Sequence, residues 1–150
     1  MKRLAVDCGS ATPSDPIYLE SARAVGRTLA ERGIGVVYGG GRLGLMGAIA
    51  DSALEAGGEV IGIIPQALVA AEVAHRGLTE LHVVDTMHQR KQAFNDLSDG
   101  FVNLPGGTGP MDELWEALSR AQIGSHAKPV GMLKCAGYAG NLVALYTKMG

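Results

Sequence analysis

The chain has 150 residues, of which 47% are hydrophobic, and a formal net charge of -2. A chain of this length folds around a single core, so we expect one domain that covers residues 1–150. The weak acidic charge, without any Lys/Arg-rich run, argues against nucleic acid as a partner. No stretch approaches the roughly 18 consecutive apolar residues of a membrane span, so we expect no membrane partner.

The cysteines and the first residues indicate a cellular compartment. Cys8 and Cys135 lie far apart without metal-binding spacing, so we interpret both as buried free thiols of a reducing compartment. The first residues carry no long apolar segment of the secretion-signal type. We therefore expect a cytoplasmic protein.

Short β-rich runs alternate with longer helical patterns along the whole chain. The predicted strands span residues 4–6, 34–38, 60–64, 81–84, 101–104 and 129–133. The predicted helices span residues 17–32, 45–56, 110–123 and 141–148. A further helix is predicted from a cap at Asp85-Thr86 to about Leu97. Residues 66–77 form a less regular segment, where a short helix and a mobile loop would fit. This alternation predicts a three-layer α/β/α fold, in which helices cover both faces of a doubly wound parallel sheet. Ligands of such folds bind beyond the carboxyl ends of the strands, where the glycine-rich loops of this chain fall.

The sequence contains 22 glycines, about twice the usual share of roughly 7%. One glycine-rich segment, residues 39–47, contains overlapping GxGxxG patterns between a strand and a helix, which is typical of a dinucleotide site. However, it follows the second predicted strand rather than the first, and residues 64–66 offer no acidic side chain for a ribose. Gly40 and Gly41 are candidate substrate contacts, and the alternative is a close strand-to-helix turn without a ligand.

The other glycine-rich segment, residues 104–110, favours phosphate binding more strongly. A strand leads into small residues that open directly into a helix, where backbone N–H groups and the helix dipole attract an anion. The segment lacks the Lys-Ser/Thr ending of a P-loop, so a monophosphate fits better than a triphosphate with magnesium. Pro110 suits the first helical position, and the candidate phosphate contacts are Gly106, Gly107, Thr108 and Gly109.

Two charged side chains are candidates for chemistry at the same edge. Glu113 lies in the first turn of the predicted helix, and the alternative is that it, like Asp112 and Glu116, only complements the helix dipole. Arg90 and Lys91 follow the fourth strand, where the alternative is a solvated basic face. Because both helices begin at the carboxyl edge of neighbouring strands, we expect Arg90 and Glu113 to face one crevice. A cation, a carboxylate and a phosphate site together are what the cleavage of a nucleotide requires.

Other polar residues are interpreted structurally. The histidines, His75, His82, His88 and His126, lack zinc-ligand spacing, so we expect no metal and interpret them as surface or packing residues, with His88 a minor pocket candidate. Ser10 has no His/Asp relay near it in sequence. We interpret it as a turn residue or a phosphate contact rather than a nucleophile.

Four motifs occur in a recognisable order: Cys8-Gly9-Ser10, residues 38–47, Met87-His88-Gln89-Arg90-Lys91, and Pro105-Gly106-Gly107-Thr108-Gly109 to Glu113. Together they closely resemble the LOG ("Lonely Guy") family of cytokinin riboside 5′-monophosphate phosphoribohydrolases, over essentially the whole chain. The most specific part is the combination of PGGxGTxxE with MHxRK. The resemblance implies a Rossmann-like homodimer that binds a nucleoside 5′-monophosphate and releases an adenine-type base and ribose 5-phosphate.

The resemblance also implies residue roles. Arg90 and Glu113 match the catalytic arginine and glutamate of the family. The substrate-binding residues are then Ser10, Gly40, Gly41, Met87, Lys91, Gly106, Gly107, Thr108, Gly109 and Glu116. We expect no cofactor: relatives have carried the label "lysine decarboxylase", but no lysine here sits in a recognisable pyridoxal-phosphate context.

Two departures from the family pattern leave alternatives open. Pro110 replaces a family threonine, which removes one hydroxyl and one N–H, although the Thr108 hydroxyl could substitute. Relatives usually continue by a further helical segment, so the chain is either short or truncated after Gly150. The alternatives are hydrolysis of plain AMP and a non-catalytic nucleotide or cofactor carrier, and a nicotinamide-dependent oxidoreductase is least favoured.

Overall fold

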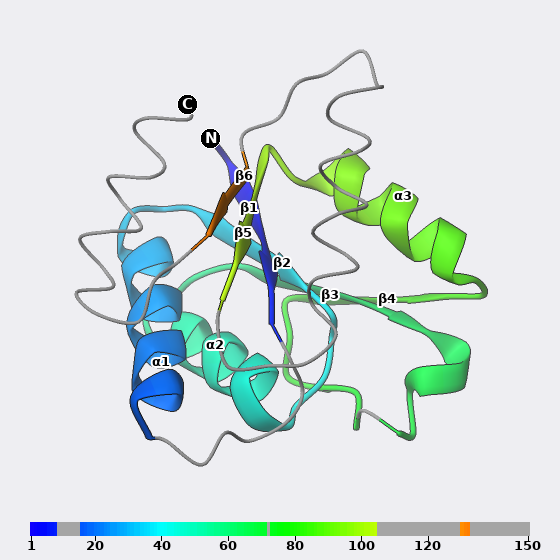
Figure 1. Cartoon of the computed structure of the whole chain (residues 1–150), viewed down its shortest axis with the longest axis horizontal. Helices are drawn as coiled ribbons and strands as arrows, with labels where there is room; N and C mark the ends of the chain where they lie inside the picture. The colour runs from blue at the N-terminus through cyan, green and yellow to red at the C-terminus, as the bar shows by residue number, and fades with distance from the viewer. Residues whose placement is uncertain (9–15, 72, 105–129, 133–150) are drawn as a thin grey trace.

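The computed structural model describes residues 1–8, 16–71, 73–104 and 130–132 (Figure 1). Within these residues, six parallel strands form one sheet in the order β4-β3-β2-β1-β5-β6. The strands are β1 (Arg3–Asp7), β2 (Gly35–Tyr38), β3 (Val60–Pro65), β4 (Glu80–Val84), β5 (Gly100–Asn103) and β6 (Val130–Met132). Each strand that the sequence predicts is confirmed, and no end differs by more than a single residue.

The strand order reverses beside β1. The first four strands step across the sheet in one direction, and β5 then pairs with the other side of β1, where Asp7 lies opposite Asn103. Right-handed crossovers place the helices of the connections from β1 to β2 and from β2 to β3 on one face of the sheet, and the helix of the connection from β4 to β5, which reverses the direction, on the other face. The predicted doubly wound fold is therefore confirmed, and its ligand position lies at the carboxyl ends of the central strands.

Helices cover both faces of the sheet. In the described residues the connections contain α1 (Pro16–Glu31), α2 (Gly44–Glu55), the short 3₁₀ turn η1 (Gln66–Leu68) and α3 (Met87–Leu97). Figure 1 shows α1 and α2 side by side against one face of the sheet, whereas α3 lies against the opposite face. Among the described residues of the irregular segment 66–77, the single helical element is the turn η1. The helices predicted at 110–123 and 141–148 lie outside the described residues.

Alternate residues of the strands belong to two cores. In β2, Val36 and Tyr38 pack with buried residues of α1 and α2, while Val37 belongs to a second core, against which Phe94 and Leu97 of α3 pack. A strand that is buried on both faces needs apolar residues at every position. This requirement explains the continuous apolar runs in the sequence and confirms the three layers.

Cys8 follows β1 and is only partly buried, so the expectation of a buried side chain is wrong for this cysteine. It lies where the chain leaves the buried strand at the edge of the sheet. Cys135 is outside the described residues. None of the helices in the described ranges is long and apolar enough to cross a membrane.

Candidate nucleotide site

The chain continues from β2 at the carboxyl edge of the sheet into residues 39–41, which we call the triple-glycine loop. Each of its carbonyl oxygens accepts a hydrogen bond from a different part of the chain. Nη2 of Arg90 donates to the first carbonyl at 3.0 Å, the backbone N–H of His75 to the second at 2.9 Å, and the Tyr38 hydroxyl to the third at 2.7 Å. Buried peptide groups need such partners, and these partners fix the path of the loop.

Arg90 of α3 is buried, with 5% of its surface exposed. Its Nε donates to the carbonyl of Ile63 in β3 at 3.0 Å, and its Cζ lies 5.7 Å from the centre of the Phe94 ring. Hydrogen bonds to carbonyls and contact with an aromatic face offset part of the cost of burying a charge. The guanidinium is therefore held between the carboxyl ends of β2 and β3, and the alternative of a solvated face is wrong for Arg90.

The glycines beside this arginine have a structural reason of their own. A Cβ on Gly39 would lie 2.6 Å from Nη2 of Arg90, so any side chain here displaces the guanidinium. Gly40 has a φ of +82°, and a Cβ there would lie 3.3 Å from side-chain atoms of both Ile64 and Leu81. That left-handed conformation favours glycine. The glycine pattern thus serves internal packing, and substrate contact by Gly40 and Gly41 stays a prediction.

A capping box fixes the beginning of α3. The side-chain oxygen of Thr86 accepts from the Gln89 N–H at 3.1 Å, and the Gln89 side chain accepts from the Thr86 N–H at 3.2 Å. Gln89 also accepts from the Asp85 N–H at 2.8 Å. The predicted cap is confirmed, and the reciprocal pair orients the first turn of the helix that carries Arg90.

The other described members of the predicted site lie at different depths. Gly40, Gly41 and Arg90 are buried together, whereas Met87 is 44% exposed at the start of α3 and Lys91 is half-buried. The predicted residues that lie outside the described part of the chain are Ser10, Gly106, Gly107, Thr108, Gly109, Glu113 and Glu116.

The structure does show where the second glycine-rich segment begins. The Leu104 N–H donates to the carbonyl of Asp7 at 2.8 Å, so the chain leaves β5 beside the carboxyl end of β1. This position is the point where the strand order reverses. It is the ligand position expected for a doubly wound fold, but the pairing of Arg90 with Glu113 stays a prediction.

Three side chains that shape this edge, Tyr38, His75 and Phe94, are not among the site residues that the sequence predicts. Burial raises the pKa of Tyr38 far above its ordinary value, so its hydroxyl stays protonated and donates to the loop. The described histidines are packing or surface residues, as predicted: His75 is buried, while His82 and His88 are exposed, and His126 lies outside the described residues. In the described ranges, no three His, Cys, Asp or Glu side chains are grouped so that they could hold a metal ion.

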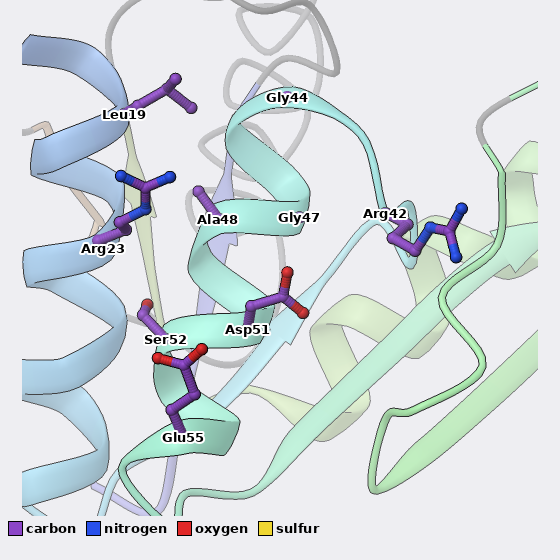
Figure 2. A pocket seen from close by; sticks show the side chains of 9 residues that line it. All are labelled: Leu19, Arg23, Arg42, Gly44, Gly47, Ala48, Asp51, Ser52 and Glu55. Atoms are coloured by element: carbon purple, nitrogen blue, oxygen red, sulfur yellow. The ribbon is translucent and has the colours of Figure 1, made fainter. Parts of the chain in front are cut away.

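An open groove of about 320 Å³ lies along α1 and α2, and Arg90 is not among its described lining residues (Figure 2). The charged residues that line it in the described part of the chain are Arg23, Arg42, Asp51 and Glu55, whose formal charges balance. In Figure 2, Arg42 extends away from both helices. None of the predicted site residues that the structure describes lines this groove, whereas Gly40, Gly41 and Arg90 are buried together at the carboxyl edge of the sheet. We place the candidate site at the edge that holds Arg90.

A doubly wound parallel sheet, with a glycine loop and a buried arginine at its carboxyl edge, defines a Rossmann-like protein with a candidate nucleotide site. A family model described as "Possible lysine decarboxylase" matches residues 46–149. The chain is 45% identical over 133 residues to the cytokinin riboside 5′-monophosphate phosphoribohydrolase of Rhodococcoides fascians, covering 88% of this chain and 67% of that one. It is 42% identical over 147 residues to LOG7 of Arabidopsis thaliana, which carries the same enzyme name, covering 98% and 68%. The chain therefore belongs to the LOG family.

Solved structures agree with this fold. The structure of TM1055 is 27% identical, has a TM-score of 0.71, and is matched over 95% of this chain and 80% of that one. A molybdenum cofactor carrier protein of Chlamydomonas reinhardtii has a TM-score of 0.71 at 20% identity, covering 97% and 98%. The second likeness shows the fold alone. The chain spans about two thirds of the length of the curated relatives it matches.

Proposed function

We propose that this protein hydrolyses the N-glycosidic bond of cytokinin riboside 5′-monophosphates, N6-substituted forms of AMP, and releases the free base and ribose 5-phosphate. Relatives at 42% and 45% identity carry this activity in their names. The structural observation that carries the proposal is the buried Arg90 guanidinium, held at the carboxyl ends of β2 and β3. A cation there suits a substrate that brings a phosphate and develops negative charge on its leaving base.

Cleavage of a ribosyl C–N bond creates positive charge on the sugar and negative charge on the departing base. We assign Glu113 to anchor the ribose hydroxyls and to stabilise the sugar cation or orient water, as carboxylates do in glycoside hydrolysis. Arg90 would stabilise charge on the base or the sugar. Because carbonyls and an aromatic ring already hold its guanidinium, it needs little reorganisation during the reaction.

The remaining predicted residues would bind and orient the nucleotide. Phosphate contacts are assigned to Ser10 and to the segment Gly106–Gly109, and Glu116 completes the substrate contacts after β5. Gly40 and Gly41 would approach the nucleotide through backbone atoms. Met87 and Lys91 lie within one turn of Arg90 on α3, where they would border the base. Binding energy from the phosphate then positions a bond that is remote from it.

The proposal includes a homodimer working in the cytoplasm. Val83 and Met87 are large apolar side chains that are each 44% exposed, and a second subunit would cover them. The wide separation of the two cysteines in the sequence, Cys8 and Cys135, suits a reducing compartment. Sedimentation at several protein concentrations tests the dimer, and a monomer at all of them contradicts it.

One assay tests the function directly. The protein is incubated with isopentenyladenosine monophosphate, AMP and the matching nucleoside, and free base is measured by chromatography. We expect base from the prenylated nucleotide and far less from the nucleoside, because the phosphate supplies the binding energy. Faster release from AMP would make the protein an AMP nucleosidase, and binding without release from either nucleotide would make it a carrier.

Glu113→Gln is the matched variant for this assay. Glutamine keeps the size of the side chain and one acceptor oxygen but removes the charge, so nucleotide binding should persist while turnover falls at least about a hundredfold. Binding is measured by calorimetry with AMP. Hydrolysis at the wild-type rate by the variant would overturn the role of Glu113.

A further inference from the structure

The segment before β4 runs along the triple-glycine loop and holds it from one side. Gly41 and Ala74 form an antiparallel bridge, and the Arg42 N–H donates to the carbonyl of Val73 at 2.9 Å. The His75 N–H donates to the carbonyl of Gly40, the peptide group next to the one that holds Arg90. We call Val73–His75 the clamp.

The side chain of His75 ties this clamp to the rest of the molecule. Its Nε2 lies 2.7 Å from a carboxylate oxygen of Asp51 on α2, and its Nδ1 accepts from the Gly77 N–H at 3.0 Å. Because the backbone N–H must donate, Nδ1 is the acceptor and Nε2 carries the proton toward Asp51. Only 8% of the surface of His75 is exposed, so the ring is fixed by packing as well as by both hydrogen bonds.

We infer that His75 is a positioning residue for Arg90: its bond to Asp51 holds the clamp, the clamp holds the triple-glycine loop, and the loop carbonyl holds the guanidinium. The inference rests on the proposed function, in which Arg90 acts on the nucleotide. A reacting group misplaced by about 1 Å can cost about a hundredfold in rate. Loss of the link between His75 and Asp51 should therefore lower kcat more than it raises KM.

The chain offers a closely matched control. Asp51 and Glu80 each bind a histidine, at 2.7 Å and 3.0 Å, and their side chains are 57% and 56% exposed. The partner of Glu80 is His82, which lies in β4 and outside the clamp. Asp51→Ala and Glu80→Ala therefore remove equally exposed carboxylates, and only the first removal reaches the clamp.

The experiment measures steady-state kinetics on isopentenyladenosine monophosphate and amide hydrogen exchange of residues 39–42. For Asp51→Ala we expect kcat to fall about tenfold with KM within about twofold, and exchange in the loop to become faster. Glu80→Ala should change neither quantity. In a His75→Asn background, which keeps an acceptor for the Gly77 N–H but loses the bond to Asp51, Asp51→Ala should have no further effect.

Unchanged kcat in Asp51→Ala, or an equal loss in Glu80→Ala, would overturn the inference. So would a fall in kcat that only follows the folded fraction measured by circular dichroism. If the wild-type protein releases no base from any nucleotide, the proposed function fails instead. In that case, amide hydrogen exchange of residues 39–42 still tests whether His75 holds the loop. If this exchange is unchanged in Asp51→Ala, the positioning role of His75 is also refuted.

Discussion

The two ends of β2 each place a glycine against an arginine, but the arginines are held differently. At the amino end, Gly35 lies beside Arg3, whose Nε donates to Glu59 at 2.7 Å, and the two charged side chains are 34% and 40% exposed. At the carboxyl end, Gly39 lies beside Arg90, which is 5% exposed and bonded to backbone carbonyls.

The difference in burial between the two arginines indicates which one contributes to stability and which one to function. A half-exposed ion pair is screened by water and contributes little to folding. A buried guanidinium is costly to place, and such costs are typical of functional sites, where other parts of the fold offset them. We therefore expect changes at the carboxyl end of β2 to impair the reaction, whereas changes at the amino end should act on stability alone.

The largest effect is expected from Arg90→Lys compared with Arg3→Lys. A lysine ammonium keeps the charge but lacks the planar fork that reaches the carbonyls of Ile63 and Gly39 while lying over a ring. We expect kcat for base release to fall about a hundredfold or more, while Arg3→Lys stays close to wild type. Steady-state kinetics on folded samples provide the comparison. Equal losses in the two variants would remove the functional distinction between the two ends.

A smaller effect is expected from the glycines themselves. In Gly39→Ala the new Cβ would lie 2.6 Å from Nη2 of Arg90, so the buried guanidinium must move, and kcat should fall about tenfold. In Gly35→Ala the nearest atom is a Glu59 side-chain oxygen at 2.5 Å, which can swing toward solvent. Kinetics should therefore change only in Gly39→Ala. A loss of the same size in Gly35→Ala would show that any added methyl at an end of β2 disturbs the site through the sheet.

The strands and the helix start at this edge of the sheet are predicted well from the sequence because their signals are local. Short apolar strands bounded by glycine, and Thr86 before a helix, predict elements from neighbouring residues alone. The box formed by Thr86 and Gln89 was also visible as a Thr-x-x-Gln pattern, although only the cap itself was predicted. The strand bounds are accurate for the same reason.

The side-chain positions within the edge could not be predicted in the same way. Backbone carbonyls of Ile63 and Gly39 hold Arg90. Because every residue has a backbone carbonyl, these hydrogen-bond partners cannot be recognised from residue types. His75 binds a carboxylate 24 residues away, and only the packing of its segment beside α2 brings Asp51 within reach. Motif resemblance predicts a catalytic role for Arg90, whereas the burial and the hydrogen-bond partners of its side chain depend on long-range geometry.

The smallest effect is expected at the Arg3–Glu59 pair and concerns stability. The hydrogen bond from Arg3 lowers the pKa of Glu59 below its ordinary value, so the pair stabilises the folded state above the carboxyl pKa of unfolded chains, about 4.3. This contribution is lost as the pH falls through the lower, folded pKa, because the carboxylate then becomes protonated in both states.

Urea unfolding of wild type and Glu59→Gln at neutral and acidic pH measures this contribution. Since both side chains are at least one-third exposed, the wild type should be more stable by less than about 1 kcal/mol at pH 7, and the difference should shrink toward zero in acid. Glu59→Gln should release base at the wild-type rate. A stability difference that grows on acidification would mean that the charged carboxylate opposes folding. A fall in kcat for Glu59→Gln would mean that changes at the amino end of β2 also affect the site.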